Sequence, residues 1–298
     1  MARRRLRMRS AALALAMLWA LASAGGAAAA GDAACRFTYE LRVRGQTVAR
    51  LELSEEWTAP DRAVLRPVIA NAGFTTLFTS RRAEMETAVR VASPALPERF
   101  RAREEKPDRA REIRIDYGPD GAIRSLVYRN RGRAVASEVP RGLWRETVDP
   151  LTAFVRLQRW VDSRPEPGAR VVVPVFDGRK RLDIEAVFAA AEPREGAPLL
   201  WRLRVRLHGI VGFEDGYGFV GGTRGPARWL DVVVDDGRCP APLLVVPADG
   251  GLDPAITRTR ALRPPARRRR CPCPAGAAAA PRSRTSRGRC RSRRPAHP

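Results

Sequence analysis

The stretch CRFTYELRVRGQTVARLEL, residues 35–53, alternates strictly between apolar and polar side chains. Its first half places Cys35, Phe37, Tyr39, Leu41 and Val43 on one side. Successive side chains of a strand point to opposite faces of a sheet, so each half of the stretch reads as a half-buried strand. With a turn at Gly45-Gln46, the stretch predicts an antiparallel hairpin that places one face in a core.

The same alternation recurs along the chain and predicts further hairpins. Gly118-Pro119-Asp120-Gly121 supplies the residues that a turn requires, and Asp177-Gly178 tolerates the positive φ angles of a type I′ turn. The inward side chains after Asp177-Gly178 are expected to be Leu182, Ile184, Ala186 and Phe188. The strands expected from these patterns cover residues 112–117, 122–128, 171–176, 179–188, 199–207, 227–234 and 242–246.

One segment, residues 149–163, has helical spacing instead. Asp149 and Pro150 suit the N-cap and first position of a helix, and Pro165, Pro167 and Gly168 end it. The sequence therefore predicts a mainly β fold: a curved antiparallel sheet or partly closed β-barrel with one helix, which plugs or covers the sheet.

The first thirty residues have the layout of a secretory signal peptide. Five arginines precede an apolar run of about twelve residues, too short to span a membrane, and small residues follow. Cleavage is expected after Ala24 or Ala30, and the mature protein is expected in the periplasm. A lipoprotein acylated at Cys35 is disfavoured, because Asp32 stands where such sites carry a Leu-like residue.

Residues 31–263 are expected to form a single β-rich domain, and residues 264–298 a disordered tail. The tail has eleven arginines and no acid; with the five of the signal segment, these account for most of the net charge of +23. It lacks the apolar residues needed to fold. The tail either binds an anionic polymer or lipid, or it is weakly selected sequence that resembles an out-of-frame translation. Because the protein is expected to be exported, no specific nucleic-acid partner is expected.

The cysteines predict a disulfide and no metal site. An exported chain with Cys35 and Cys239 in its core favours a bridge between them, which would contribute on the order of 4–5 kcal/mol in the chain-entropy model. Cys271 and Cys273 lack a second pair or a histidine at ligand spacing, so no zinc is expected.

No catalytic residue is assigned from the sequence, and no cofactor is expected. His208 and His297 are the only histidines, which argues against a His-based triad or a multi-histidine metal site. Two acids suffice for glycoside hydrolysis, so a carboxylate-dependent hydrolase stays an alternative. The acids that cluster in strand ends and loops are Glu214, Asp215, Asp231, Asp235 and Asp236.

The loop at Gly221-Gly222-Thr223-Arg224-Gly225 offers backbone N–H groups for a phosphate, but it lacks the P-loop Lys-Ser/Thr ending. A hairpin loop is the preferred interpretation. Beside it, Phe213, Tyr217 and Phe219 are the candidate ligand-binding residues, which either line a pocket mouth or anchor the loop on the core.

Three segments carry a likeness to a family. They are the hairpin at 39–48, Leu96-Pro97-Glu98-Arg99-Phe100 before an Arg-rich strand, and ETVDPLTAFVRLQR (146–159) followed by VFDGRKR (175–181). Over roughly residues 35–250 the chain resembles an exported bacterial family called domain of unknown function 3108, which has a similar Asp-Pro-Leu helix and Phe-Asp-Gly-Arg hairpin. The resemblance implies an antiparallel β fold and an envelope location, and it transfers no catalytic residue.

The leading functional hypothesis is a non-enzymatic envelope protein that binds a lipid or another apolar ligand. The alternating strands would enclose the ligand, and an arginine-studded outer face would favour an anionic membrane surface. The alternatives are a hydrolase of envelope polysaccharide and an envelope assembly scaffold. The sequence does not identify protein partners.

Overall fold

The computed structural model describes residues 34–77, 80–107, 109–195, 197–213, 220–221, 227–235, 241–249 and 255–262. The strands are β1 (Ala34–Val43), β2 (Gln46–Ala59), β3 (Arg62–Asn71), β4 (Arg82–Arg90), β5 (Leu96–Lys106), β6 (Arg109–Tyr117), β7 (Ile123–Asn130), β8 (Arg133–Ala134), β9 (Arg170–Phe176), β10 (Arg181–Arg194), β11 (Ala197–Val211), β12 (Val220–Gly221), β13 (Trp229–Asp235), β14 (Pro242–Pro247) and β15 (Ala255–Leu262). The helices are η2 (Gly73–Leu77), η3 (Arg141–Trp144) and α2 (Pro150–Asp162).

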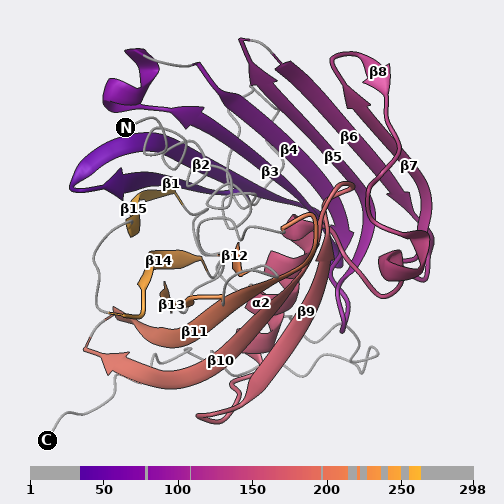
Figure 1. Cartoon of the computed structure of the whole chain (residues 1–298). Coiled ribbons are helices and arrows are strands. Elements are labelled where there is room, and N and C mark those ends of the chain that lie inside the picture. The colour runs from indigo at the N-terminus through magenta and orange to yellow at the C-terminus, as the bar shows by residue number, and fades with distance from the viewer. Residues whose placement is uncertain are drawn as a thin grey trace, which may run out of the picture. The chain divides into compact units, whose positions relative to one another are not determined.

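The strands form one sheet, in the order β8-β7-β6-β5-β4-β3-β2-β1-β15-β14-β13-β11-β10-β9. All of these neighbours are antiparallel, and the short β12 pairs with β11 in parallel. The first strand, β1, lies in mid-sheet between β2 and β15. Figure 1 shows the sheet curving around α2. In the described residues the sheet is not closed, so the fold-class prediction is confirmed in its open form.

The core lies on the inner face, and the alternation seen in the sequence places it there. Phe37, Leu53 and Leu65 from neighbouring strands are at most 2% exposed. Leu182, Ile184, Ala186 and Phe188 are all buried, as the sequence predicts. In the part of the chain that the structure describes, no helix has the length and apolar character needed to cross a bilayer.

Two turns differ from the prediction by one residue. In the first hairpin the positive φ angles fall on Arg44 and Gly45, because Val43 pairs with Gln46. In the β9–β10 hairpin the central residues are Gly178 and Arg179, since Asp177 N–H donates to the carbonyl of Lys180. Only Gly178 has a positive φ, 92°. The type I′ prediction is therefore wrong, and the φ pattern is that of a type II′ turn, with Gly at its first central position.

The Asp177–Lys180 turn touches the opposite end of the sheet. A Cβ on Gly178 would lie 2.6 Å from Ile113 of β6 and 3.2 Å from Leu126 of β7. The chain before α2 covers the outer edge of β9, where Val148 N–H donates to the carbonyl of Pro174 at 3.0 Å. The two ends of the sheet thus approach each other across the turn without pairing as strands.

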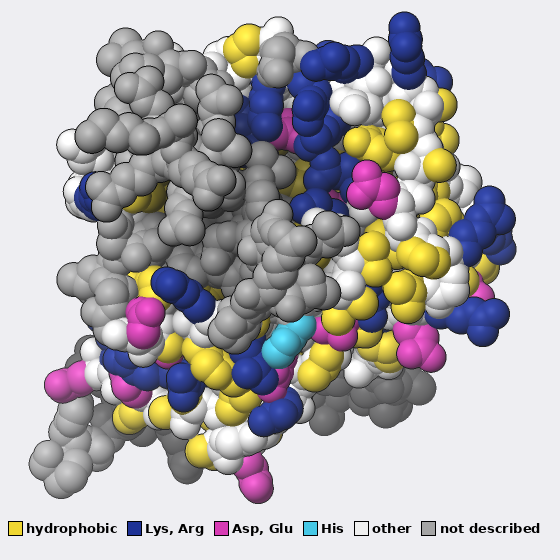
Figure 2. All heavy atoms as spheres, in the orientation of Figure 1, with side chains coloured by type: hydrophobic (Ala, Val, Ile, Leu, Met, Phe, Trp, Pro, Cys, Tyr) yellow, Lys and Arg dark blue, Asp and Glu magenta, His cyan; other side chains and the backbone are white. Residues whose placement is uncertain are grey.

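Many outer-face arginines pair with acids on neighbouring strands. Glu86 of β4 accepts hydrogen bonds from Arg66 at 3.0 Å and from Arg99 at 2.9 Å. Glu185 of β10 accepts one from Arg206 at 2.6 Å and pairs with Arg170 at 3.1 Å. In the view of Figure 2, basic and acidic side chains lie interspersed over much of the surface. The outer face is therefore less cationic than its arginine content alone suggests.

The N-terminus of α2 is fixed by a buried carboxylate. Asp149 is 0% exposed, and its Oδ1 accepts N–H bonds from Leu151 at 2.9 Å and from Thr152 at 3.0 Å. The Thr152 hydroxyl donates to Oδ2 at 2.5 Å, and the side chains of Thr87 on β4 and Tyr117 on β6 lie close to the carboxylate. Burial raises the pKa of Asp149, although these hydrogen bonds oppose the increase. The predicted cap is confirmed, and it also attaches α2 to the sheet.

Asp149→Ala should lower the free energy of unfolding by about 1–3 kcal/mol, because the helix N–H groups and the Thr152 hydroxyl lose a buried acceptor. Asp149→Asn, which keeps a capping oxygen, should cost less than the alanine variant. Denaturant unfolding of the two variants measures the difference. Equal losses in both would show that the cap does not hold α2.

Candidate functional site

Two cavities flank α2, and we call the first the apolar cavity. It has a volume of about 90 Å³ and lies between α2 and the inner face of the strands around β1 and β11. Its lining is hydrocarbon apart from the amide of Gln158 and the hydroxyl of Tyr39. The lining residues are Tyr39, Leu51, Pro150, Phe154, Leu157, Gln158, Val161, Ile184, Leu203, Val205, Val232, Val234, Pro242, Val245 and Ile256.

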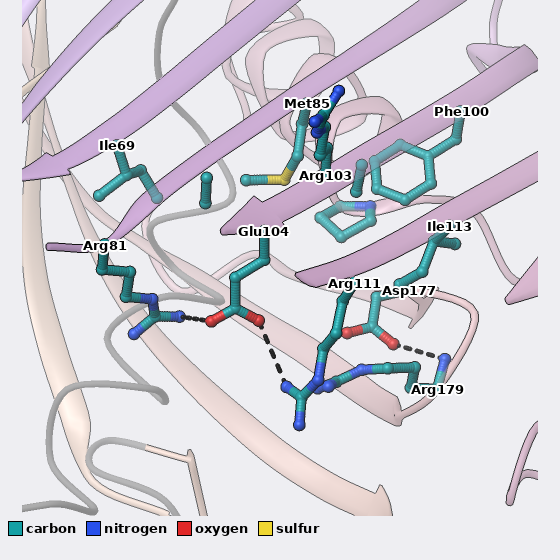
Figure 3. A pocket seen from close by; sticks show the side chains of 13 residues that line it. Ile69, Arg81, Met85, Phe100, Arg103, Glu104, Arg111, Ile113, Asp177 and Arg179 are labelled. Atoms are coloured by element: carbon teal, nitrogen blue, oxygen red, sulfur yellow. Dashed lines mark hydrogen bonds and ion pairs between the residues drawn. The ribbon is translucent and has the colours of Figure 1, made fainter. Parts of the chain in front are cut away.

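The second, the charged cavity, also has about 90 Å³ and lies on the inner face of β3–β6, beside the Asp177–Lys180 turn (Figure 3). Its floor is apolar, and the charged groups of three arginines (Arg81, Arg111 and Arg179) and two carboxylates surround it. The lining residues are Ile69, Arg81, Ala83, Met85, Phe100, Ala102, Arg103, Glu104, Arg111, Ile113, Pro150, Asp177 and Arg179. Because Pro150 also lines the apolar cavity, the first residue of α2 borders both.

Glu104 is the central acid of the charged cavity. Its Oε1 lies 2.9 Å from Arg81 Nη2 and 3.3 Å from Lys106 Nζ, and its Oε2 lies 3.3 Å from Arg111 Nη1. Burial alone would raise the pKa of Glu104, but attraction to Arg81, Lys106 and Arg111 outweighs it and lowers the pKa. Glu104 therefore stays ionised and holds three cations in place.

Asp177 has a different role in the same cavity. Its Oδ1 accepts the backbone N–H groups of Arg179 at 2.8 Å and of Lys180 at 2.7 Å, which fixes the turn. Arg179 projects from this turn, and Figure 3 shows its side chain beside that of Arg111. Burial lowers the pKa of Arg111, and repulsion by Arg179 lowers it further. Burial alone would lower the pKa of Arg179, but attraction to Asp177 and Glu104 outweighs it and raises the pKa. The two guanidinium groups thus share Glu104 as a nearby anion.

Comparison with known proteins gives a family. The family described as "Protein of unknown function (DUF3108)" matches residues 38–195, more than half of the chain. The chain belongs to this family. No curated protein matches it. It is also similar to the crystal structure of a β-barrel-like protein of domain of unknown function DUF1849 from Brucella abortus, with 10% identity and a TM-score of 0.46 over 78% of this chain and 98% of that one.

The family match covers most of β1, all of β2–β10, α2 and the Asp177–Lys180 turn, so both the N-cap and all lining residues of the charged cavity lie inside it. The segment Leu96–Phe100, expected before an Arg-rich strand, forms the first half of β5 itself. β11, β13, β14 and β15, which supply much of the apolar cavity, lie beyond the matched residues.

The described sequence candidates are engaged in structural contacts. Phe213 is 4% exposed and lies under Lys180, whose Nζ is 4.3 Å from the ring centroid. Asp235 forms a two-pronged ion pair with Arg258, at 3.0 and 2.8 Å, and the exposed Asp231 lies 3.9 Å from Arg204. His208 lies 2.8 Å from Glu185 on the outer face. Phe213 thus anchors its segment on the core.

Other predictions fall outside the described residues. They concern the signal segment 1–30, Glu214, Asp215, Tyr217, Phe219, Gly222–Gly225, Asp236, Cys239 and the tail 264–298. Cys35 is buried and disulfide-bonded, but its pairing with Cys239 stays a prediction. Within the described residues, no group of three or more His, Cys, Asp or Glu side chains is placed to hold a metal ion.

The charged-cavity residues were missed by the sequence analysis, although β5 and β6 contain a signal for them. The inner positions of β5 run Phe100, Ala102, Glu104, and those of β6 run Ile115, Ile113, Arg111. On both strands the apolar face becomes charged at the same level, because Glu104 pairs with Arg111. Arg179 comes from a distant hairpin, and its arrival here depends on the curvature of the sheet.

Glu104→Gln should reduce stability at pH 7 by about 1–3 kcal/mol, because three cations lose their shared anion. The folded-state pKa of Glu104 is lowered, so its contribution is present above the unfolded pKa and is lost as pH falls through the folded pKa. The wild-type advantage should therefore shrink from neutral pH towards about pH 3.

Chemical denaturation at several pH values measures this advantage. The neighbouring Glu105→Gln is the control, since Glu105 forms an exposed pair with Arg103 at 2.6 Å. Exposed pairs contribute about 0–1 kcal/mol, so this control should change stability little. A Glu104→Gln effect that is the same at every pH would contradict the assigned ion cluster.

Proposed function

We propose that this protein is an exported envelope protein without catalytic activity, and that it binds a lipid chain or another apolar ligand in the apolar cavity under α2. The observation that carries the proposal is the lining of that cavity. Of its fifteen residues, only Gln158 and Tyr39 bring polar side-chain atoms. Sites for small apolar ligands are concave and largely hydrocarbon, with few polar groups that set orientation.

The size of the cavity sets a condition on binding. A dry cavity of about 150 Å³ can hold a benzene ring, whereas the apolar cavity has about 90 Å³. It therefore accepts a short hydrocarbon stretch in the described form, and a longer chain requires α2 to move. Leu157, Gln158 and Val161 line the cavity from the C-terminal part of α2, while Asp149 holds the other end. We propose that the C-terminal part lifts to admit the chain.

The hydrolase alternative has less support. A general acid needs a raised pKa, and the pKa of Glu104 is lowered. Burial raises the pKa of Asp149, but this carboxylate is 0% exposed and is engaged in capping α2. Asp177, the other carboxylate of the charged cavity, is engaged with two backbone N–H groups of its own turn. Asp235 is paired with Arg258. These acids have structural partners that account for them, which favours binding over hydrolysis.

The periplasmic location and binding to an anionic membrane surface also belong to the proposal. The location rests on the arginine-rich, then apolar, then small-residue order of residues 1–30. Membrane attraction would have to come from outer arginines that lack acidic partners or from the tail, since Arg66, Arg99 and Arg206 pair with glutamates.

Expression of the full chain in a Gram-negative host should give a periplasmic protein cleaved after Ala24 or Ala30. Its non-reducing peptide map should contain a linked pair of peptides carrying Cys35 and Cys239. Cell fractionation and mass spectrometry of the peptides measure both. An uncleaved cytoplasmic chain would contradict the proposed periplasmic location. A bridge from Cys35 to Cys271, Cys273 or Cys290 would contradict the predicted Cys35–Cys239 disulfide.

Val205→Phe should weaken the binding of dodecanol by about tenfold, because the ring occupies cavity volume that about two methylene groups would fill. Val205 lines the apolar cavity from β11. Isothermal titration with dodecanol measures the dissociation constant.

Val187→Phe is the matched control, because Val187 pairs with Arg204 on the outer face of the adjacent strand. Its affinity for dodecanol should equal that of the wild type. The absence of dodecanol binding to the wild type would refute the proposed function, and equal weakening by both variants would place the ligand elsewhere.

A further inference from the structure

The charged cavity carries more positive than negative charge. The guanidinium groups of Arg81, Arg111 and Arg179 face Glu104 and Asp177 there, whereas the Arg103 side chain lies on the outer face with Glu105. Asp177 directs an oxygen to backbone N–H groups, and Glu104 is shared among Arg81, Lys106 and Arg111. Figure 2 shows Lys and Arg side chains gathered over the upper middle of the view, where Figure 1 draws β3–β5. The cluster therefore has the charge to accept a further anion.

Arg111 has hydrogen-bonding capacity left over. Its side chain is 14% exposed, and it spends one Nη1–H on Glu104 at 3.3 Å. Among the described residues, its buried Nε has no hydrogen-bond partner. A buried guanidinium donor without an acceptor is costly, and a carboxylate or phosphate oxygen satisfies such a donor best.

The walls of the cavity suit more than a small ion. The lining also includes Met85, Phe100 and Ile113, and Pro150 lines both this cavity and the apolar cavity. A free inorganic anion gains nothing from these hydrocarbon surfaces. A molecule with a charged head and an alkyl chain would contact both, with the chain directed along α2.

We propose that the charged cavity binds the oxyanion head group, carboxylate or phosphate, of an amphiphile whose chain occupies the apolar cavity. Arg111 and Arg179 contact the head group, and Glu104 positions Arg111 and Arg81 around it. The inference rests on the proposed function and adds the ligand class: an anionic rather than a neutral lipid. Arginine suits this role because its planar fork matches both oxyanions.

The test compares three ligands by isothermal titration against the full chain: dodecyl phosphate, dodecanol and inorganic phosphate. The wild type should bind dodecyl phosphate at least about tenfold more tightly than dodecanol, as one to two charge-assisted hydrogen bonds would give. Arg111→Gln and Arg179→Gln should each remove most of this preference and leave dodecanol affinity unchanged. Retained dodecanol binding also shows that the variants fold.

Arg114→Gln is the matched control, because Arg114 lies on β6 but on its outer face, paired with Glu112 at 2.8 Å. It should keep the full preference. Equal affinity of the wild type for dodecyl phosphate and dodecanol would overturn the head-group site while leaving the proposed function intact. Inorganic phosphate that binds as tightly as dodecyl phosphate would overturn the amphiphile and indicate a site for free oxyanions.

Discussion

A buried carboxylate at the start of α2 is the contact on which the rest of the structure depends. Asp149 caps the helix through Leu151 and Thr152, and its carboxylate lies close to Thr87 of β4 and Tyr117 of β6. Burying this group raises its pKa, so the fold maintains an acceptor that is unfavourable to desolvate. In return, α2 has a fixed position on the inner face of the sheet. Both cavities border its first residue, Pro150, and their positions follow from that attachment.

The geometry divides the inner face into a hydrocarbon part and a charged part. Around β1 and β11 the inner side chains are aliphatic or aromatic, and the apolar cavity under α2 is lined almost entirely by hydrocarbon. At the ends of β5 and β6 the same face carries Glu104 and Arg111, and the Asp177–Lys180 turn adds Arg179 from the far end of the sheet. An amphiphile is the ligand class whose two ends match these two surroundings.

The sequence predicted the parts of the fold that depend on local pattern. The alternation of 35–53, the Asp-Pro start of α2 and the inward side chains of β10 appear as expected. The strands β3, β4 and β15 were not predicted. The pairing of β1 with β15 was not predicted either, because register between distant strands depends on tertiary packing. Part of the charged cavity was missed for the same reason: Arg179 reaches Glu104 and Arg111 only after the sheet curves. Phe213, a candidate from its place beside a loop, is buried beneath Lys180.

The central claim is that the inner face under α2 holds an amphiphile, and native mass spectrometry of the full chain purified from the periplasm without detergent tests it most directly. The expected spectrum contains a species heavier than the mature chain by the mass of one lipid, which dissociates at raised collision energy and yields an anion in negative-ion mode. A spectrum that contains only the bare mature chain, at the gentlest conditions that keep other lipid complexes intact, would contradict it.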